Sequence, residues 1–254
     1  MQKEQIGINL YSVRELISGP DSFTAVLEQI RNIGYRAVEL YEIPTGISPS
    51  KIRKVCDSLQ LAICGIHSLN VVDDYKTICS VLNELDSEYV CYPYPEGIDL
   101  LDIGQLKELI YKLNKAGKYL KSCGKTLTYH NHQIEFQFHN GKLILDQILD
   151  GTDSLNVQFE LDVYWIQNGG SNPENWIEKL NDRLPQIHLK DYRINSKGNP
   201  VSCQLGRGNL DMKKIISKAE KSGCKWFIVE QEDFSTSPIT ELACSYKFLE
   251  QFVY

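Results

Sequence analysis

The sequence predicts an α/β fold, a single (β/α)8 TIM barrel with parallel strands and outer helices, in one domain spanning residues 1–254. Eight short apolar or β-branched runs alternate with segments of helical periodicity, which is typical of a parallel sheet covered by helices. Each strand–helix unit occupies about 32 residues, near the size of a βα repeat. Eight such units are the number that closes a barrel, and about 250 residues is its usual length.

The expected strands are the apolar and β-branched runs. In chain order they lie at 6–11, 36–41, 61–67, 89–94, 125–130, 156–162, 185–190 and 226–231. A doubly wound open sheet is the alternative architecture, and it normally has a glycine-rich phosphate-binding turn after its first strand. No such motif follows 6–11, and the G-R-G at 206–208 lacks the third glycine. The closed barrel is therefore the expected arrangement.

The segments between these runs have the apolar spacing of amphipathic helices. Apolar residues recur three and four positions apart within 23–33, 52–59 and 106–120. Asp21 and Pro49 stand where helices begin, and Gly34 and Gly124 stand where a helix ends in a left-handed residue.

Composition narrows the classes of function. There are 27 Lys and Arg residues against 33 Asp and Glu, the net charge is -6, and the basic residues are scattered. A nucleic-acid-binding protein needs a basic stripe for the phosphates, so none is expected as a partner. No apolar run reaches the roughly 18 residues of a membrane span, and no apolar signal region follows Met1. We therefore expect no membrane partner and a cytoplasmic location, while a homo-oligomer stays open.

The eight cysteines include no C-x-x-C pair, and several lie within apolar runs. A disulfide framework is the alternative, but a chain of this length needs no covalent staples. Buried, reduced cysteines are expected, which agrees with a reducing compartment.

Polar residues gather at the ends of the last four predicted strands. In a (β/α)8 barrel the chemistry lies at these C-terminal ends. The polar stretches are Tyr129–His132, Glu160–Asp162, His188–Asp191 and Glu230–Asp233. Residues at i and i+2 share a face, roughly 6.8 Å apart. An unpaired carboxylate leaving an apolar run is costly, and a divalent cation would relieve that cost. A mixed Asp, Glu and His set suits manganese first, with zinc, iron(II) or cobalt as alternatives.

A structural interpretation competes with the metal site at each position taken alone. A single His near a strand end often only satisfies hydrogen bonds, and a single Asp or Glu often caps the following helix. Asp162 has the position of such a cap, although Val163, Tyr164 and Trp165 follow it. Residue types that bind metals occur at four consecutive strand ends. This favours one shared metal site over four separate structural roles.

Further residues are expected to line the same mouth. Glu39 and His67 end the second and third strands, Tyr92 and Tyr94 end the fourth, and His132, Trp165 and Arg207 follow later ones. Aromatic rings beside polar groups suit a sugar, which shows both C–H faces and hydroxyls. Glu39 could instead pair with Arg36 or Arg14. Glu160, one step below Asp162, is expected to support a ligand or pair with Lys190.

An ordered set of motifs carries a resemblance. The segments are GYRAVEL at 34–40, YHNHQIEF at 129–136, ELDVYW at 160–165, HLKD at 188–191, GRGNLD at 206–211 and IVEQED at 228–233. Together they resemble the sugar phosphate isomerase/epimerase family of the xylose isomerase-like barrel superfamily, over essentially the whole chain. The relatives include ketose 3-epimerases, inosose dehydratases, hydroxypyruvate isomerases and enzymes acting on 3-keto-glycosides, with endonuclease IV more distant.

The resemblance implies a divalent metal held by Glu, Asp, His and Glu on strands five to eight. Asp162, His188 and Glu230 match the last three ligands, but His130 stands at the strand-five position. In the epimerases the two glutamates also form the acid/base pair, so that mechanism does not carry over unchanged. His130 is expected to bind the metal or to act as a base, and His132 to contact the substrate.

The expected activity is isomerisation or epimerisation of a sugar or keto-sugar, by proton abstraction next to a carbonyl to give an enediolate. Glu230 and His130 are the expected acid/base groups. Lys190 is expected to stabilise the oxyanion, unless it only forms a salt bridge with Asp191 or Glu160. The substrate contacts are assigned to Glu39, His67, His132, Trp165 and Arg207. A dehydratase or 3-keto-glycoside-cleaving lyase, a barrel without a metal and a non-catalytic sugar-binding barrel remain alternatives. An endonuclease IV-like phosphodiesterase would need more metal ligands and a basic face.

Overall fold

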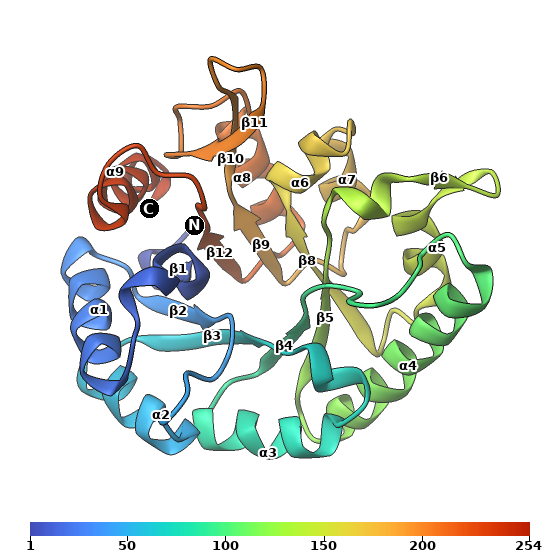
Figure 1. Cartoon of the computed structure of the whole chain (residues 1–254), viewed down its shortest axis with the longest axis horizontal. Helices are drawn as coiled ribbons and strands as arrows, with labels where there is room; N and C mark the ends of the chain where they lie inside the picture. The colour runs from blue at the N-terminus through green and yellow to red at the C-terminus, as the bar shows by residue number, and fades with distance from the viewer.

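The computed structural model describes residues 1–254 and contains a closed barrel of eight parallel strands with helices around it (Figure 1). The barrel strands are β1 Ile6–Asn9, β2 Ala37–Leu40, β3 Ala62–His67, β4 Tyr89–Tyr92, β5 Thr126–His130, β8 Val157–Asp162, β9 Gln186–Leu189 and β12 Trp226–Val229. Each strand pairs with its neighbours in chain order, and β12 closes the barrel against β1. The predicted fold class and all eight strands are confirmed, with shorter ends.

Helices cover the outer surface of the barrel, as Figure 1 shows. Their bounds are α1 Pro20–Ile33, α2 Pro49–Ser58, α3 Tyr75–Leu85, α4 Ile103–Ser122, α5 Ile144–Gly151, α6 Val163–Asn168, α7 Pro173–Lys179, α8 Met212–Lys221 and α9 Pro238–Leu249. None of them combines the length and the apolar character that crossing a membrane requires. Gly34 ends α1 with φ of 131°, and a Cβ there would lie 2.4 Å from the Tyr246 ring. The close contact and the backbone conformation both require glycine.

Short elements in the loops were absent from the sequence prediction. They are two hairpins, β6 Phe138–His139 with β7 Lys142–Leu143 and β10 Asp191–Ile194 with β11 Pro200–Cys203, and the 3-10 segments Lys3–Gln5, Leu10–Leu16, Leu69–Val72 (η3), Gln133–Phe136 and Glu250–Phe252. The β10–β11 hairpin begins almost directly after β9, so no turn signal separates the two strands in the sequence.

Apolar side chains fill the space between the strands and the helices, where 60 buried residues form one continuous core. Inside the barrel, Ala37, Cys64 and Ile228 form a second small apolar cluster. All eight cysteines are free thiols, and six of them are buried. The expectation of reduced cysteines is therefore confirmed, while Cys123 and Cys244 are exposed.

Glu241 in the first turn of α9 fixes the connection that follows β12. Its carboxylate is 2% exposed and accepts hydrogen bonds from the backbone N–H groups of Ser235 and Thr236, at 2.8 and 2.7 Å. The hydroxyls of both residues and the side-chain amide of Gln231 also donate to it. Burial alone would raise the pKa of Glu241, but these hydrogen bonds lower it to about 2. The ionised carboxylate therefore stabilises the fold.

Replacing this carboxylate should lower stability in a pH-dependent way. We expect Glu241→Gln to reduce the free energy of unfolding by about 2 kcal/mol at pH 7, because hydrogen bonds to a charged group are lost. The pKa of Glu241 is depressed by folding, so its contribution is complete above the unfolded pKa of about 4.5 and is lost as the pH falls towards 2. Urea unfolding of both proteins at pH 7, 5 and 3.5 should show a gap that narrows at the lowest pH. A gap independent of pH would contradict this assignment.

Candidate metal centre

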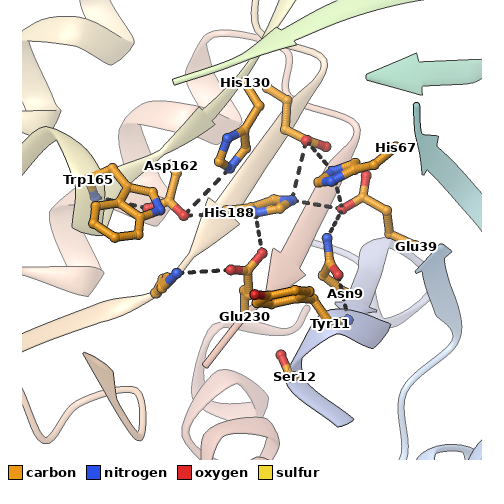
Figure 2. Close-up of polar contacts among 12 residues, drawn as sticks. Asn9, Tyr11, Ser12, Glu39, His67, His130, Asp162, Trp165, His188 and Glu230 are labelled. Carbon is orange, nitrogen blue, oxygen red and sulfur yellow. Dashed lines mark hydrogen bonds and ion pairs between the residues drawn. The ribbon is translucent and has the colours of Figure 1, made fainter. Parts of the chain in front are cut away.

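The parallel register brings four metal-type side chains from four successive strand ends together. They are His130 at the end of β5, Asp162 at the end of β8, His188 in β9 and Glu230 just after β12. One donor atom from each lies within 4.8 Å of the other three. His130 Nε2 is 3.6 Å from Asp162 Oδ2, and His188 Nδ1 is 3.0 Å from Glu230 Oε2 (Figure 2). The four predicted ligands therefore form one group, which we call the ligand cluster.

Three of the four residues of the ligand cluster have donor atoms without hydrogen-bond partners. Both ring nitrogens of His130, Asp162 Oδ2 and His188 Nδ1 are buried and make no hydrogen bond of acceptable geometry. Unsatisfied buried polar atoms are rare because each costs about 1–3 kcal/mol. One such atom on each of His130, Asp162 and His188 lies close to the Glu230 carboxylate, and a cation bound between them would satisfy their lone pairs. The residues present thus fit a divalent ion held by His130, Asp162, His188 and Glu230.

Asp162 caps a helix and also offers one oxygen to the ligand cluster. Its Oδ1 accepts a hydrogen bond of 3.0 Å from the backbone N–H of Trp165 and so caps α6. Its other oxygen, Oδ2, has no partner and faces the ligand cluster. The helix cap holds the carboxylate in one orientation and leaves one oxygen free for a cation.

Most of the ionisation states agree with metal binding, which needs neutral imidazoles and ionised carboxylates. Burial, and next the charge of His188, hold the pKa of His130 well below its usual range, which keeps the imidazole neutral. Burial raises the pKa of Glu230, but Lys190 and then His188 reverse this and hold it well below its usual range. Burial raises the pKa of Asp162 to about 6, so this carboxyl is still mostly ionised at pH 7. His188 differs: burial lowers its pKa, but Glu160 and then Glu39 raise it well above the usual range, so a bound cation would have to displace its proton.

A second group of buried residues lies beside the ligand cluster and shares His188 with it (Figure 2). Glu39 Oε2 is 2.7 Å from His188 Nε2, and Glu160 Oε2 is 2.9 Å from His67 Nε2. Glu39 and Glu160 are both 0% exposed. With Nε2 bonded to Glu39, His188 turns Nδ1 towards the ligand cluster, the arrangement by which a carboxylate orients a metal-binding histidine. We call Glu39, His67 and Glu160 the support group.

The predicted partners of Glu39 and Glu160 differ from those in the structure. Glu39 does not line the cavity, and its partners are His188, His67 and Asn9 rather than Arg36 or Arg14. Glu160 contacts His67 and His188 and not Lys190. Residues far apart in the sequence meet here through the closure of the barrel, which strand patterns alone do not reveal.

Lys190 is fixed by two carboxylates that follow β12. It is 1% exposed, lies 2.9 Å from Glu230 Oε1 and also pairs with Glu232. Its ammonium group also lies 4.8 Å from the Trp165 ring centre. The expected salt bridge of Lys190 to Asp191 or Glu160 is therefore wrong. Lys190 places its positive charge against the ligand cluster and fixes one oxygen of Glu230.

A cavity of about 560 Å³ opens above the ligand cluster. Its walls include His67, His130, His132, Trp165 and Glu230 of the predicted site. The rings of Tyr94, His132 and Trp165 lie in contact, with centres 5.0 Å and 5.2 Å apart in turn. The cavity also exposes Glu232 of the predicted Glu230–Asp233 stretch, together with Asn9 and Tyr11, which sequence reasoning missed. Asn9 and Tyr11 end the first predicted strand, so the strand-end rule would have found them.

Arg207 lies outside this cavity, in a separate hollow with Cys244 and Phe248. The G-R-G segment instead wraps around the Asp191 carboxylate, which accepts hydrogen bonds from the backbone N–H groups of Gly206 and Gly208 at 2.9 and 3.0 Å. A Cβ at Gly208 would stand 2.2 Å from Asp191 Oδ1. The two glycines thus let the backbone approach the buried Asp191 carboxylate and donate hydrogen bonds to it. We leave Arg207 out of the proposed site.

Fold and site together define the class: a (β/α)8 barrel with a cluster of metal-type ligands and a cavity at the C-terminal mouth. The chain belongs to the xylose isomerase-like TIM barrel family, whose model matches residues 27–252. The resemblance drawn from the motifs is confirmed at this level.

Known proteins with similar structure or sequence carry related names. A sugar phosphate isomerase/epimerase from Parabacteroides distasonis superposes with a TM-score of 0.83 at 24% identity, covering 98% of this chain and 94% of that one. An L-ribulose 3-epimerase superposes with a TM-score of 0.76 at 15% identity, covering 99% and 94%. The inosose dehydratase of Geobacillus kaustophilus is 23% identical over 202 residues, which are 71% of this chain and 63% of that protein. The match thus spans less than two thirds of the curated relative.

The support group generates a test of cation binding. We expect Glu39→Gln to weaken the binding of Mn²⁺ or Zn²⁺ about 10- to 100-fold, because His188 loses the carboxylate that orients it. Isothermal titration calorimetry of chelator-treated protein measures this, with Asp162→Ala/Glu230→Ala as the reference that binds no ion. Glu28→Gln on the exposed face of α1 is the matched control and should bind like the parent. Equal affinities for parent and Glu39→Gln would contradict the orienting role.

Proposed function

We propose that this protein is a divalent-metal-dependent isomerase or epimerase that moves a proton next to the carbonyl of a sugar or keto-sugar. The observation that carries the proposal is the ligand cluster itself: four buried donors from successive strands, at the floor of a cavity with aromatic walls, with unpartnered donor atoms on His130, Asp162 and His188. A purely structural role would leave these atoms hydrogen-bonded. Their orientation towards one point supports a cation site that faces a bound small molecule.

In the proposed reaction, the bound ion and the side chains of the protein have different roles. A divalent ion held by His130, Asp162, His188 and Glu230 would polarise the substrate carbonyl and stabilise the enediolate that forms when the neighbouring proton leaves. Lys190 keeps Glu230 ionised and adds positive charge beside the developing oxyanion. Manganese is the first candidate for the ion, with zinc, cobalt and iron(II) as alternatives, because the donors are two imidazoles and two carboxylates.

Two groups are suited to move the proton. Glu230 is an ionised carboxylate at the cavity floor, and His130 is a neutral imidazole on the cavity wall. They follow β12 and β5, which are separated in the barrel by β9 and β8, so they approach a substrate from different sides. One group takes the proton and the other can return it. His132 and Trp165 then orient the sugar ring by hydrogen bonding and by stacking.

Dehydration is the second candidate reaction. A curated relative of this chain is named inosose dehydratase, and removal of a proton next to a carbonyl is the first step of both reactions. Loss of a hydroxyl from the next carbon gives the dehydratase outcome, and return of the proton gives the epimer. NMR of the products in D₂O separates the two, because epimerisation incorporates deuterium at carbon without loss of water.

Glu230→Gln should abolish turnover while leaving the fold intact. We expect the rate of deuterium exchange into a panel of free ketoses and keto-sugars, measured with added Mn²⁺, to fall by about 10²–10⁴-fold, since a positioned acid/base group supplies this much. The substitution keeps the size of the side chain, and circular dichroism should be unchanged. Glu28→Gln is the control with the same chemical change.

The outcomes separate the proposal from its alternatives. Exchange by the parent that persists after chelation would contradict the metal requirement. Binding of a sugar without any exchange or dehydration would identify a non-catalytic binding barrel. Full activity of Glu230→Gln would assign the proton transfer to other residues.

A further inference from the structure

The cavity above the ligand cluster is lined by apolar side chains as well as by the polar groups already described. The apolar ones include Tyr41 and Ile43 after β2, Leu69 in η3, and Ile78 and Val81 on α3, and the same loops also place Glu42, Ser68 and Asn70 in the lining. We call the five apolar residues the apolar wall. The apolar wall and the polar groups belong to the same cavity of about 560 Å³, so one molecule can contact both.

The apolar wall is built into the fold and is open to the cavity. Tyr41, Ile43, Ile78 and Val81 are half-buried and pack against the main core on their inner side. Leu69 remains 40% exposed. Apolar surface in contact with water is unfavourable compared with buried apolar surface. An apolar group of a ligand that covers this wall would gain the difference in free energy.

The charges of the residues that line the cavity disfavour a ligand with a phosphate group. None of the residues that line it is Lys or Arg, whereas Glu42, Glu230 and Glu232 all face it. Lys190 lies near the floor but is already paired with Glu230 and Glu232. The Arg14 guanidinium is stacked on the Tyr11 ring at 3.9 Å and is outside the lining. A phosphate placed away from the ligand cluster, with about -1.5 to -2 charges, would meet carboxylates here and no unpaired cationic side chain.

We propose that the substrate is an uncharged sugar or keto-sugar that carries an apolar substituent, such as an aryl or alkyl glycoside, and not a sugar phosphate. The sugar lies over the ligand cluster, and the substituent lies against the apolar wall. A single sugar ring has no apolar substituent, and its hydroxyls gain nothing from contact with Ile43, Leu69 or Val81. This inference rests on the proposed function, since it needs a sugar above the cluster.

Matched ligand pairs test the inference. The probes are methyl and phenyl β-D-glycosides of glucose, galactose and xylose, with glucose and glucose 6-phosphate as a further pair. Dissociation constants are measured by calorimetry on Zn²⁺-loaded protein, and saturation-transfer NMR identifies the protons in contact. We expect at least one phenyl glycoside to bind at least about tenfold more tightly than its methyl partner, as burial of a ring predicts. Glucose 6-phosphate should bind no more tightly than glucose.

Variants of the apolar wall identify where the substituent lies. Leu69→Asn changes an exposed side chain, so the fold should be retained. We expect it to weaken phenyl glycoside binding roughly three- to tenfold, and Ile43→Asn/Leu69→Asn to remove the advantage of the phenyl group. Methyl glycoside binding should not change. Leu101→Asn is the matched control, because Leu101 is 42% exposed and does not line the cavity.

The failures are distinguishable. Equal affinities of the methyl and phenyl partners, or equal losses in Leu69→Asn and Leu101→Asn, would overturn the apolar subsite and leave the proposed function standing. Tighter binding of glucose 6-phosphate than of glucose would overturn the exclusion of phosphate. Absence of binding by all the glycosides, combined with proton exchange into free ketoses, would overturn the inference while supporting the proposed function. Absence of both binding and exchange would overturn the two together.

Discussion

The burial of four carboxylates at the mouth of the barrel is the constraint on which the rest of the site depends. Glu39 and Glu160 are fully enclosed, and Asp162 and Glu230 line the layer above. Buried charges require partners, because desolvation is expensive. His67, His188 and Lys190 supply part of the compensation, and the ligand cluster retains unpartnered lone pairs that a cation would satisfy. The position of nearly every polar residue near the axis follows from this requirement.

The fold and the ligand cluster were predictable because both depend on local patterns. Apolar runs define the strands, and parallel strands bring their ends to one rim, so His130, Asp162, His188 and Glu230 had to meet. The partners of Lys190 and the place of Glu39 were not predictable. The partners of Lys190 depend on which of several carboxylates its long side chain reaches. The place of Glu39 depends on its meeting His188 from a distant part of the sequence across the closed barrel. The path of the loop at 206–210 depends on one buried aspartate, so the direction of Arg207 was also beyond sequence patterns.

Contacts with the surrounding fold hold three of the ligands in place. The support group fixes His188, the cap of α6 fixes Asp162, and Lys190 fixes Glu230. Each of these three ligands is therefore held by a contact that uses one of its two polar atoms and leaves the other towards the ligand cluster. The same elements shape the walls, since α6 carries Trp165 and η3 carries Leu69. Rigid placement of the donors and the form of the cavity are thus two results of the same packing.

Histidine at position 130 also has a consequence for electron transfer. Two carboxylates and two neutral imidazoles carry two negative charges, which match a +2 ion, whereas a third carboxylate would favour +3. A less negative set of ligands raises the reduction potential of a redox-active ion, because the oxidised state gains less electrostatic stabilisation. Manganese or iron held by this set would be harder to oxidise in air than the same ion held with a third carboxylate in place of His130. That resistance would be separate from any part the histidine plays in proton transfer.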